Sequence, residues 1–242
     1  MKRLDLPYRP AAENLAADEA LLDWSEAGHG DETLLFWEPR ETFVVVGYAN
    51  RVATEVNVAA CGQNGIPIFR RCSGGGAVVQ MPGGLNYSLI LRIRENLPTQ
   101  NITAANHFIM EKNRAAIQSA IGGPSSAISV RGHTDICLDG KKIAGNSQRR
   151  RKNFLLFHGT LLLNCNLAQI SELLLMPSLQ PHYRAGRPHS DFVTNLNLSA
   201  ATVKAALADE WNAGEELNQP PVVEISRLAR EKYSAREWNF KF

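Results

Sequence analysis

The chain has 242 residues, of which 44% are hydrophobic and 21% are charged, and its net charge is +2. This length and composition are typical of a globular protein with a sizeable core. The small net charge gives no reason to expect nucleic acid as a partner. The N-terminal MKRLDLPYRP lacks the apolar segment of a signal peptide, and no run of about eighteen apolar residues could span a bilayer. We therefore expect neither nucleic acid nor membrane as a partner.

Cysteine and histidine spacing excludes two further classes of site. The four cysteines have no C-x-x-C spacing, and the six histidines form no HExxH motif. These patterns argue against a structural zinc site and against a metal held by protein ligands alone. Widely separated cysteines fit a reducing compartment, so we expect a cytoplasmic protein. The cysteines are Cys61, Cys72, Cys137 and Cys165.

Hydrophobic periodicity and turn residues predict the elements of the N-terminal half. An amphipathic pattern closed by Gly28 predicts the first helix, and Pro39 separates the first two strands. The predicted elements in chain order are a helix over 10–27, strands over 34–37 and 43–47, a short helix over 54–64, strands over 66–70 and 86–94, and a helix over 102–121.

The C-terminal half begins with strands and ends with helices. Asp139-Gly140 predicts a hairpin turn. The predicted elements are strands over 128–130, 135–138, 142–144 and 154–163, a helix over 167–175, an ordered loop or lid over 177–190, and helices over 200–213 and 223–233. This order lacks the alternation of a doubly wound sheet. We expect one α+β domain over 1–242, with mixed or antiparallel sheets flanked by helices.

Two segments stand out chemically. Three consecutive glycines, Gly74 to Gly76, follow the basic pair Arg70-Arg71, and such a run is kept where the backbone approaches something closely. Residues 141–152 contain six basic side chains and no acidic one. A local basic segment suits phosphates or an acidic protein partner, although a solvated turn is an equal alternative. Together the segments predict a site for a phosphate-bearing or adenylated acyl group.

Four motifs carry a family resemblance. RRCSGGGAV, GHTDICLDGKKIAGNSQ, HGTLL and DFVTNL occur in this order. The chain thereby resembles the lipoate–protein ligase family, which has the biotin/lipoate ligase catalytic fold. The resemblance implies that ATP and Mg²⁺ activate lipoic acid as an acyl adenylate. The acyl group would then pass to a lysine of an acidic lipoyl carrier domain or of a glycine-cleavage H-type protein.

The resemblance also implies roles for individual residues. Lys142 would contact the activated carboxyl, where a fixed ammonium stabilises the charge of the transition state. Asp135 would lie near the adenylate and bind Mg²⁺. The implied substrate-binding residues are Arg70, Arg71, Ser73, Gly74, Gly75, Gly76, Ala77, Val78, Gly145, His158, Gly159 and Thr160. The loop that would close over the adenylate includes Arg184, Arg187, Asp191, Val193 and Thr194.

Three departures from the family pattern leave the reaction open. Gln80 stands where many members have histidine, Gly132 to Asp135 read GHTD rather than GRND, and the sequence ends at Phe242 where many continue into an accessory domain. The first interpretation is an ATP-dependent lipoate–protein ligase, aided by a separate accessory subunit. The alternative is an octanoyl or lipoyl transferase that uses a preformed acyl donor, or a thioester on Cys137, without adenylation. A non-enzymatic lipoate- or biotin-binding regulator is disfavoured because no helix-turn-helix segment precedes the fold.

Overall fold

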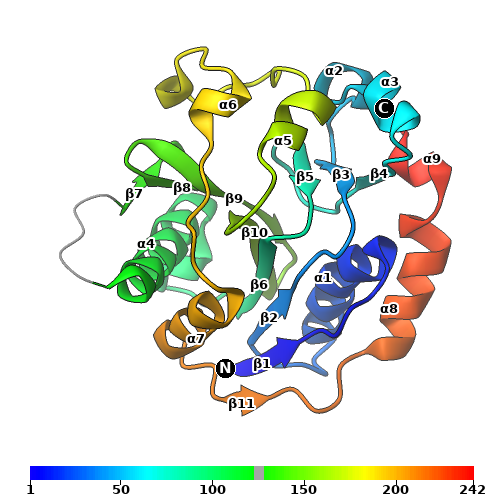
Figure 1. The fold of residues 1–242 in the computed structure, drawn as a ribbon. Helices are drawn as coiled ribbons and strands as arrows, with labels where there is room; N and C mark the ends of the chain where they lie inside the picture. The colour runs from blue at the N-terminus through cyan, green and yellow to red at the C-terminus, as the bar shows by residue number, and fades with distance from the viewer. Residues whose placement is uncertain (123–127) are drawn as a thin grey trace.

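Two sheets form the frame of the computed structural model, which describes residues 1–122 and 128–242 (Figure 1). The large sheet contains, in spatial order, β11 (Glu215–Glu216), β1 (Lys2–Asp5), β2 (Thr33–Trp37), β6 (Gly84–Arg92), β10 (Phe154–Leu162), β9 (Lys141–Arg150), β8 (Asp135–Leu138) and β7 (Ile128–Arg131). The small sheet contains β4 (Ile68–Arg70), β3 (Phe43–Val46) and β5 (Val78–Gln80).

The strand directions confirm the predicted mixed sheets. β1 runs parallel to both β2 and β11, whereas the strands from β2 to β7 pair antiparallel. In the small sheet, β3 is parallel to β4 and antiparallel to β5. The chain is therefore an α+β protein, as the order of the predicted elements indicated.

Helices pack against both sheets. The helices of the described residues are α1 (Ala11–Glu26), α2 (Val52–Glu55), α3 (Val58–Gln63), α4 (Ile102–Ile121), α5 (Ala168–Leu173), α6 (His189–Phe192), α7 (Ala200–Glu210), α8 (Val222–Leu228) and α9 (Arg236–Asn239). α4 and α7 share one core with the sheet, and α1 and α8 share another on its opposite face (Figure 1). A third core joins the small sheet to α2, α5 and α6. Because side chains alternate along a strand, Leu89 enters the first core and Ile90 the second.

Several boundaries differ from the sequence prediction for identifiable reasons. β9 continues to Arg150 instead of ending at residue 144, because it pairs with β10 as far as Leu155. The helix predicted over 54–64 is two short helices, since Val56 is extended and the side chain of Asn57 caps the second. The segment predicted as a loop or lid contains a short 3₁₀ turn and α6. The short strands β1, β5 and β11 were not predicted.

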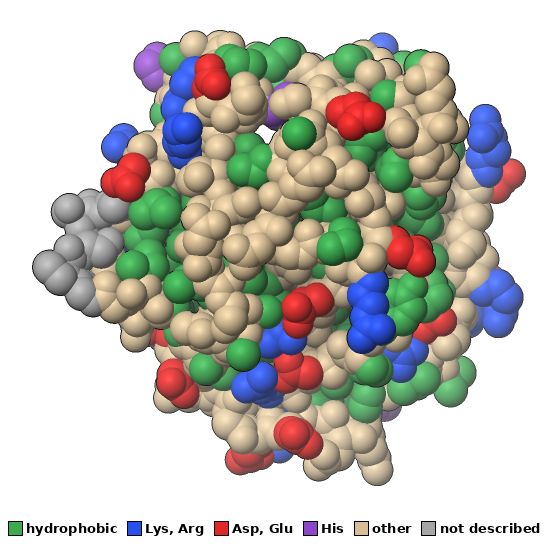
Figure 2. Space-filling model, in the orientation of Figure 1, with side chains coloured by type: hydrophobic (Ala, Val, Ile, Leu, Met, Phe, Trp, Pro, Cys, Tyr) green, Lys and Arg blue, Asp and Glu red, His purple; other side chains and the backbone are tan. Residues whose placement is uncertain are grey.

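On the face that Figure 2 shows, acidic and basic side chains are interspersed, so neither positive nor negative charge dominates it. In the part of the chain that the structure describes, no helix has the length and apolar character needed to cross a membrane.

Candidate active site

The strand register builds two rows of residues across the face of the large sheet that looks toward the small sheet. Asn86, Thr160, Gly145 and Asp135 are successive partners on β6, β10, β9 and β8. A second row contains Ser88, His158 and Ser147, two positions along the same strands. Residues two apart on a strand share a face and lie about 7 Å apart. The HGT and KIAGNS motifs therefore meet because β9 and β10 are paired.

The lysine that the sequence singled out reaches the first row through its side chain and meets Asp135 there. Lys142 Nζ lies 2.7 Å from Asp135 Oδ1. A Cβ built on Gly145 would lie 2.7 Å from the same Nζ, so glycine leaves the room that the ammonium fills. Tyr183 Oη donates to Asp135 Oδ2 at 2.7 Å. Sequence reasoning missed Tyr183, whose loop is rich in Pro, His, Arg and Gly and gives no signal for a tyrosine.

The same bonding argues against the Mg²⁺ contact expected at Asp135. Both of its carboxylate oxygens are engaged, one by the Lys142 ammonium and the other by the Tyr183 hydroxyl. Within residues 1–122 and 128–242, no group of three or more His, Cys, Asp or Glu side chains is assembled for a metal ion. Divalent magnesium prefers several oxygen ligands with room for water. The groups around Asp135 therefore do not form a suitable site for Mg²⁺.

The thiols of this region are poor nucleophiles. Cys137 Sγ lies 3.6 Å from Tyr183 Oη, beside the lysine–aspartate pair, but the residue is fully buried. Burial raises the pKa of the Cys137 thiol. Burial also raises the pKa of Cys72 to about 12 and that of Cys165 to about 11, and it raises the pKa of Cys61. Because the thiolate is the reactive form, burial makes these cysteines poor candidates for a nucleophile.

Hydrogen bonds from the buried side chain of Arg71 fix the conformation of the glycine loop, residues 73–76. The Arg71 guanidinium donates to the carbonyls of Gly74 and Gly76 and, at 3.1 Å, to Ser73 Oγ. Gly75 has a φ of +82°, which favours glycine. Within the described residues, a Cβ at Gly74 or Gly76 would meet no atom within 4 Å. The loop thus presents open backbone, and Arg71 shapes it.

Arg70 corrects the sequence expectation. It is fully buried, and its guanidinium donates only to backbone carbonyls. The accepting residues are Gly47, Tyr48, Asn50, Trp238 and Asn239. Arg70 therefore ties the C-terminal segment to the loop after β3, and this bonding argues against its expected role in substrate binding.

A buried chain of hydrogen bonds lies in the second row. His158 Nδ1 is 2.6 Å from Asp18 Oδ2, and His158 Nε2 is 2.5 Å from Ser73 Oγ. Ser88 Oγ donates to the other oxygen of Asp18 at 2.6 Å. Asp18 comes from α1 and is missing from the predicted site. Its signal was available, because it lies at helical spacing among the buried leucines Leu15, Leu21 and Leu22.

A second polar cluster surrounds Thr160. Its hydroxyl donates to Asn86 Oδ1 at 2.6 Å, and Gln80 Nε2 contacts both Thr160 and Asn86. Asn86 Nδ2 in turn donates to Gln80 Oε1 at 2.8 Å. Gln80 thus completes a closed amide pair between the two sheets.

Gly159 lies on the other face of β10 and is a further correction. A Cβ there would lie 1.7 Å from Asn146 Oδ1, on the side of the core with α4. Asn146 receives a hydrogen bond from Tyr87 and donates to the Thr134 carbonyl. Gly159 therefore makes room for the network that fixes the GHTD turn, and it does not face the row of Lys142 and Thr160.

The predicted adenylate loop docks on the strand that holds Lys142. Thr194 N donates to the Lys142 carbonyl at 3.0 Å, and Val193 forms a parallel bridge with Lys142. Arg184 is buried over Phe192, Arg187 donates to the Gly140 carbonyl, and Asp191 is exposed.

In the glycine segment, Ala77 and Val78 are half-buried against the cores.

The basic run is bound internally. Arg149 donates to the Cys72 carbonyl at 2.6 Å, Arg150 to the Thr99 carbonyl at 2.7 Å, and Arg151 pairs with Asp23 at 2.7 Å. These three guanidinium groups buttress the glycine loop and neighbouring turns. The expectation that the segment forms an open basic patch is therefore wrong for residues 149–151.

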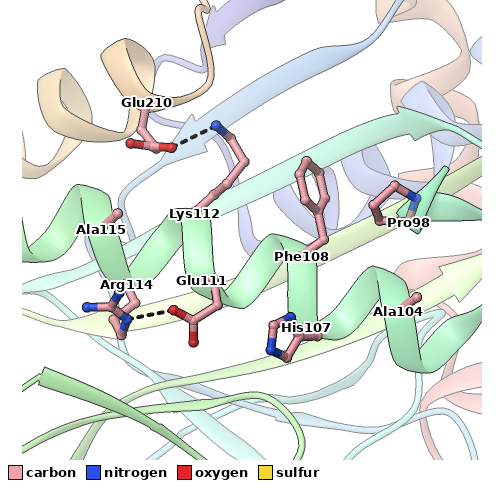
Figure 3. Close-up of a pocket in the computed structure, with 9 residues that line it drawn as sticks. All are labelled: Pro98, Ala104, His107, Phe108, Glu111, Lys112, Arg114, Ala115 and Glu210. Atoms are coloured by element: carbon pink, nitrogen blue, oxygen red, sulfur yellow. Dashed lines mark hydrogen bonds and ion pairs between the residues drawn. The ribbon is translucent and has the colours of Figure 1, made fainter.

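The groove in Figure 3 is separate from this site. It runs along the outer surface of α4, between Pro98 and the Lys112–Glu210 ion pair at the end of α7. None of its lining residues belongs to either row across the large sheet.

Comparison with known families decides the classification. The family model described as the lipoyl protein ligase A/B catalytic domain matches residues 10–211. The chain belongs to this family. Among solved structures, a bipartite lipoate protein ligase from Thermoplasma acidophilum, studied with its E2 lipoyl domain, has a TM-score of 0.81 at 24% identity, covering 99% of this chain and 96% of that one. A lipoate-protein ligase A bound with ATP has a TM-score of 0.76 at 25% identity, covering 99% and 98%.

Curated relatives correct the first interpretation of the reaction. An octanoyltransferase LipM from Geobacillus kaustophilus is 28% identical over 98% of this chain and 97% of its own length. Relatives from Halalkalibacterium halodurans and Carboxydothermus hydrogenoformans have the same name. The ATP-dependent ligase interpretation is therefore wrong, and the transferase alternative agrees better with the relatives. The GHTD and KIAG motifs identify the family but do not separate its two chemistries.

Proposed function

We propose that this protein is an octanoyltransferase that moves the acyl group from a preformed thioester donor to a lysine of a lipoyl carrier domain, without ATP. The observation that carries the proposal is the Lys142–Asp135 pair above Gly145, in a chain whose relatives from Geobacillus kaustophilus and Carboxydothermus hydrogenoformans, similar over nearly its whole length, are named octanoyltransferases. The choice of carrier is supported by the family and by the structural relative studied with its E2 lipoyl domain.

The reaction needs a fixed positive charge at the acyl carbonyl. When the amine of the carrier lysine attacks the thioester, the carbonyl oxygen becomes negative before the C–S bond breaks and the thiol leaves. The Lys142 ammonium is held in place by Asp135, which Tyr183 holds in turn. A preorganised cation stabilises this developing charge because it needs no rearrangement during the step. The open backbone at Gly74 and Gly76 offers room for a bound donor.

Direct transfer suits this chain better than a cysteine thioester. Cys137 is the cysteine beside Lys142, and burial raises its pKa, so its thiolate is disfavoured. An incoming amine that attacks the bound donor needs no enzyme thiolate. We therefore assign Lys142 as the electrostatic catalyst, with Asp135 and Tyr183 as positioning residues.

Acyl transfer can be tested directly. The purified protein is mixed with octanoyl-pantetheine or an octanoylated acyl carrier protein and a lipoyl carrier domain, and the carrier is followed by intact mass. We expect octanoylation of one carrier lysine in nucleotide-free buffer. Parallel reactions with free octanoate, with and without ATP and Mg²⁺, separate the two chemistries. Modification that occurs only with free acid and ATP would exclude the proposal.

A further inference from the structure

The mechanism above leaves one proton without an acceptor. A carrier lysine has an ordinary pKa near 10.4, so it arrives as an ammonium and must lose a proton before it can attack. Lys142 and Asp135 are bound to each other, and Asp135 also accepts from Tyr183. Neither group is therefore available as a base. The acceptor has to come from another part of the site.

The relay of Asp18, His158 and Ser73 has the required geometry. An ionised carboxylate only accepts hydrogen bonds, so the contact of 2.6 Å with Asp18 places the imidazole proton on Nδ1. Nε2 is then the acceptor and receives the Ser73 hydroxyl at 2.5 Å. A carboxylate that orients one imidazole nitrogen while the other faces a hydroxyl is an arrangement for proton transfer. All three residues of the relay are buried, with exposed fractions of 9% for His158, 3% for Asp18 and 1% for Ser73, and Ser73 directly precedes the exposed glycines 74–76.

The relay lies beside the proposed transfer point. His158 is two positions from Thr160 on β10, so it lies one row, about 7 Å, from the row of Gly145 and Asp135. Ser73 begins the glycine loop, and Ser147 Oγ donates to the Gly74 carbonyl at 3.0 Å. The row of the relay is therefore tied to the exposed glycine loop, and the row of Gly145, over which the Lys142 ammonium lies, is the next one along the sheet.

Other charged groups near the relay already have partners. Arg71 Nε donates to Ser73 Oγ at 3.1 Å, and its remaining bonds go to the carbonyls of Gly74, Gly76 and Val45. Arg149 is bound to the Cys72 carbonyl, and Glu19 is bound to Lys232 and Tyr233. The Cys72 thiol stays protonated, since burial raises its pKa to about 12. His158 is thus the group in this neighbourhood with an acceptor directed toward the loop.

We propose that the Asp18–His158–Ser73 relay is the proton acceptor of the acyl transfer; this inference rests on the proposed transferase function. One proton of the carrier ammonium moves to Ser73 Oγ as the serine proton moves to His158 Nε2, and Asp18 stabilises the imidazolium. The amine then forms the C–N bond, the C–S bond breaks, and a second proton from nitrogen leaves with the thiol. The imidazolium returns the first proton to solvent. Ser73 contacts the reacting amine, and His158 and Asp18 act through it.

The pH dependence of carrier octanoylation tests the relay. His158→Gln and Ser73→Ala are compared with the wild type between about pH 6.5 and 9.5, with melting temperatures recorded for each. Without the acceptor, only the small unprotonated fraction of carrier lysine reacts, so the variant rate rises about tenfold per pH unit. The wild-type profile is flatter, and we expect a loss of about 10²-fold or more at pH 7 that shrinks toward pH 9.5. His107→Gln, on the exposed surface of α4, is the matched control and keeps the wild-type profile.

Asp18→Asn provides a second route if either variant fails to fold, because it preserves shape while removing the carboxylate; it should show the same steepened profile. A loss of equal size at every pH would reduce the relay to a structural support and overturn the proposal. An octanoyl ester on Ser73, seen by intact mass, would also overturn it by making the serine a nucleophile. If the wild type itself transfers no octanoyl group from thioester donors, the transferase function fails and the relay's role fails with it.

Discussion

Gly145 and Lys142 are fitted to each other: a Cβ on Gly145 would lie 2.7 Å from both Cε and Nζ of the lysine. This spacing is shorter than a van der Waals contact, so any side chain at 145 moves the ammonium away from Asp135. The glycine of the KIAG motif thus serves the lysine three residues earlier.

Gly145→Ala is therefore expected to lower the rate of octanoyl transfer by about tenfold or more, because displacing a preorganised charge weakens transition-state stabilisation. Steady-state transfer to a lipoyl carrier domain measures the effect. Gly62→Ala, in α3, is the matched control: a Cβ there meets no described atom within 4 Å, and its activity should equal that of the wild type. Full activity in Gly145→Ala would show that the position of the ammonium is unimportant.

Lys142 itself should be indispensable. Lys142→Ala removes the cation, and Lys142→Arg replaces a compact point charge with a planar, delocalised one of different geometry. Each variant should lose transfer by about 10²-fold or more while remaining folded, as judged by circular dichroism and thermal melting. Near-normal octanoylation of the carrier by Lys142→Ala would remove this residue from the mechanism.

The cysteines should be dispensable for transfer. Cys137→Ser and Cys72→Ser are expected to retain most of the wild-type rate per folded molecule, because burial disfavours both thiolates. Intact mass spectrometry after incubation with octanoyl-pantetheine provides the complementary test. A thioester on the wild-type protein that disappears in Cys137→Ser would establish a covalent route and refute direct transfer.

Arg70 should matter for stability more than for substrate affinity. Arg70→Met leaves five carbonyls without their donor, so we expect a loss of about 3 kcal/mol or more in the free energy of unfolding. Urea denaturation measures the loss, and Arg51→Met, at an exposed position, is the control. A stable Arg70→Met protein with a strongly raised KM for the acyl donor would restore Arg70 to the substrate site.

Alkaline pH should destabilise the fold through the buried thiols. The pKa of Cys72 is raised from 9.0 to about 12 in the folded protein, so between these values the unfolded state binds fewer protons than the folded state. Stability is therefore retained below pH 9 and falls above it, by up to about 1.4 kcal/mol per pH unit for one such thiol. Urea denaturation at pH 8, 9 and 10 measures the slope, which should be shallower in Cys72→Ala. An identical slope in Cys72→Ala would show that the Cys72 thiol does not cause the loss of stability at alkaline pH.

The sequence predicts the long elements and the paired motifs of this protein, because hydrophobic periodicity and glycine runs are local signals. The juxtaposition of Asp135 and Lys142 follows from the Asp139-Gly140 hairpin, which pairs β8 with β9. Asp18 and Tyr183 reach the site from distant segments: the helical spacing of Asp18 indicates its burial but not its contact with β10, and no local pattern marks Tyr183. Arg70 and Gly159 were misassigned because motif membership does not reveal which side of a strand or loop a residue faces.

The most direct test of the account is a single-turnover mass measurement in nucleotide-free buffer, with octanoyl-pantetheine, a lipoyl carrier domain and either wild-type protein or Lys142→Ala. The account predicts that the wild type transfers the octanoyl group to one carrier lysine with no covalent acyl-enzyme, and that Lys142→Ala leaves the carrier unmodified on the same timescale. An unmodified carrier in the wild-type reaction, followed by modification when octanoate, ATP and Mg²⁺ are supplied, would contradict it.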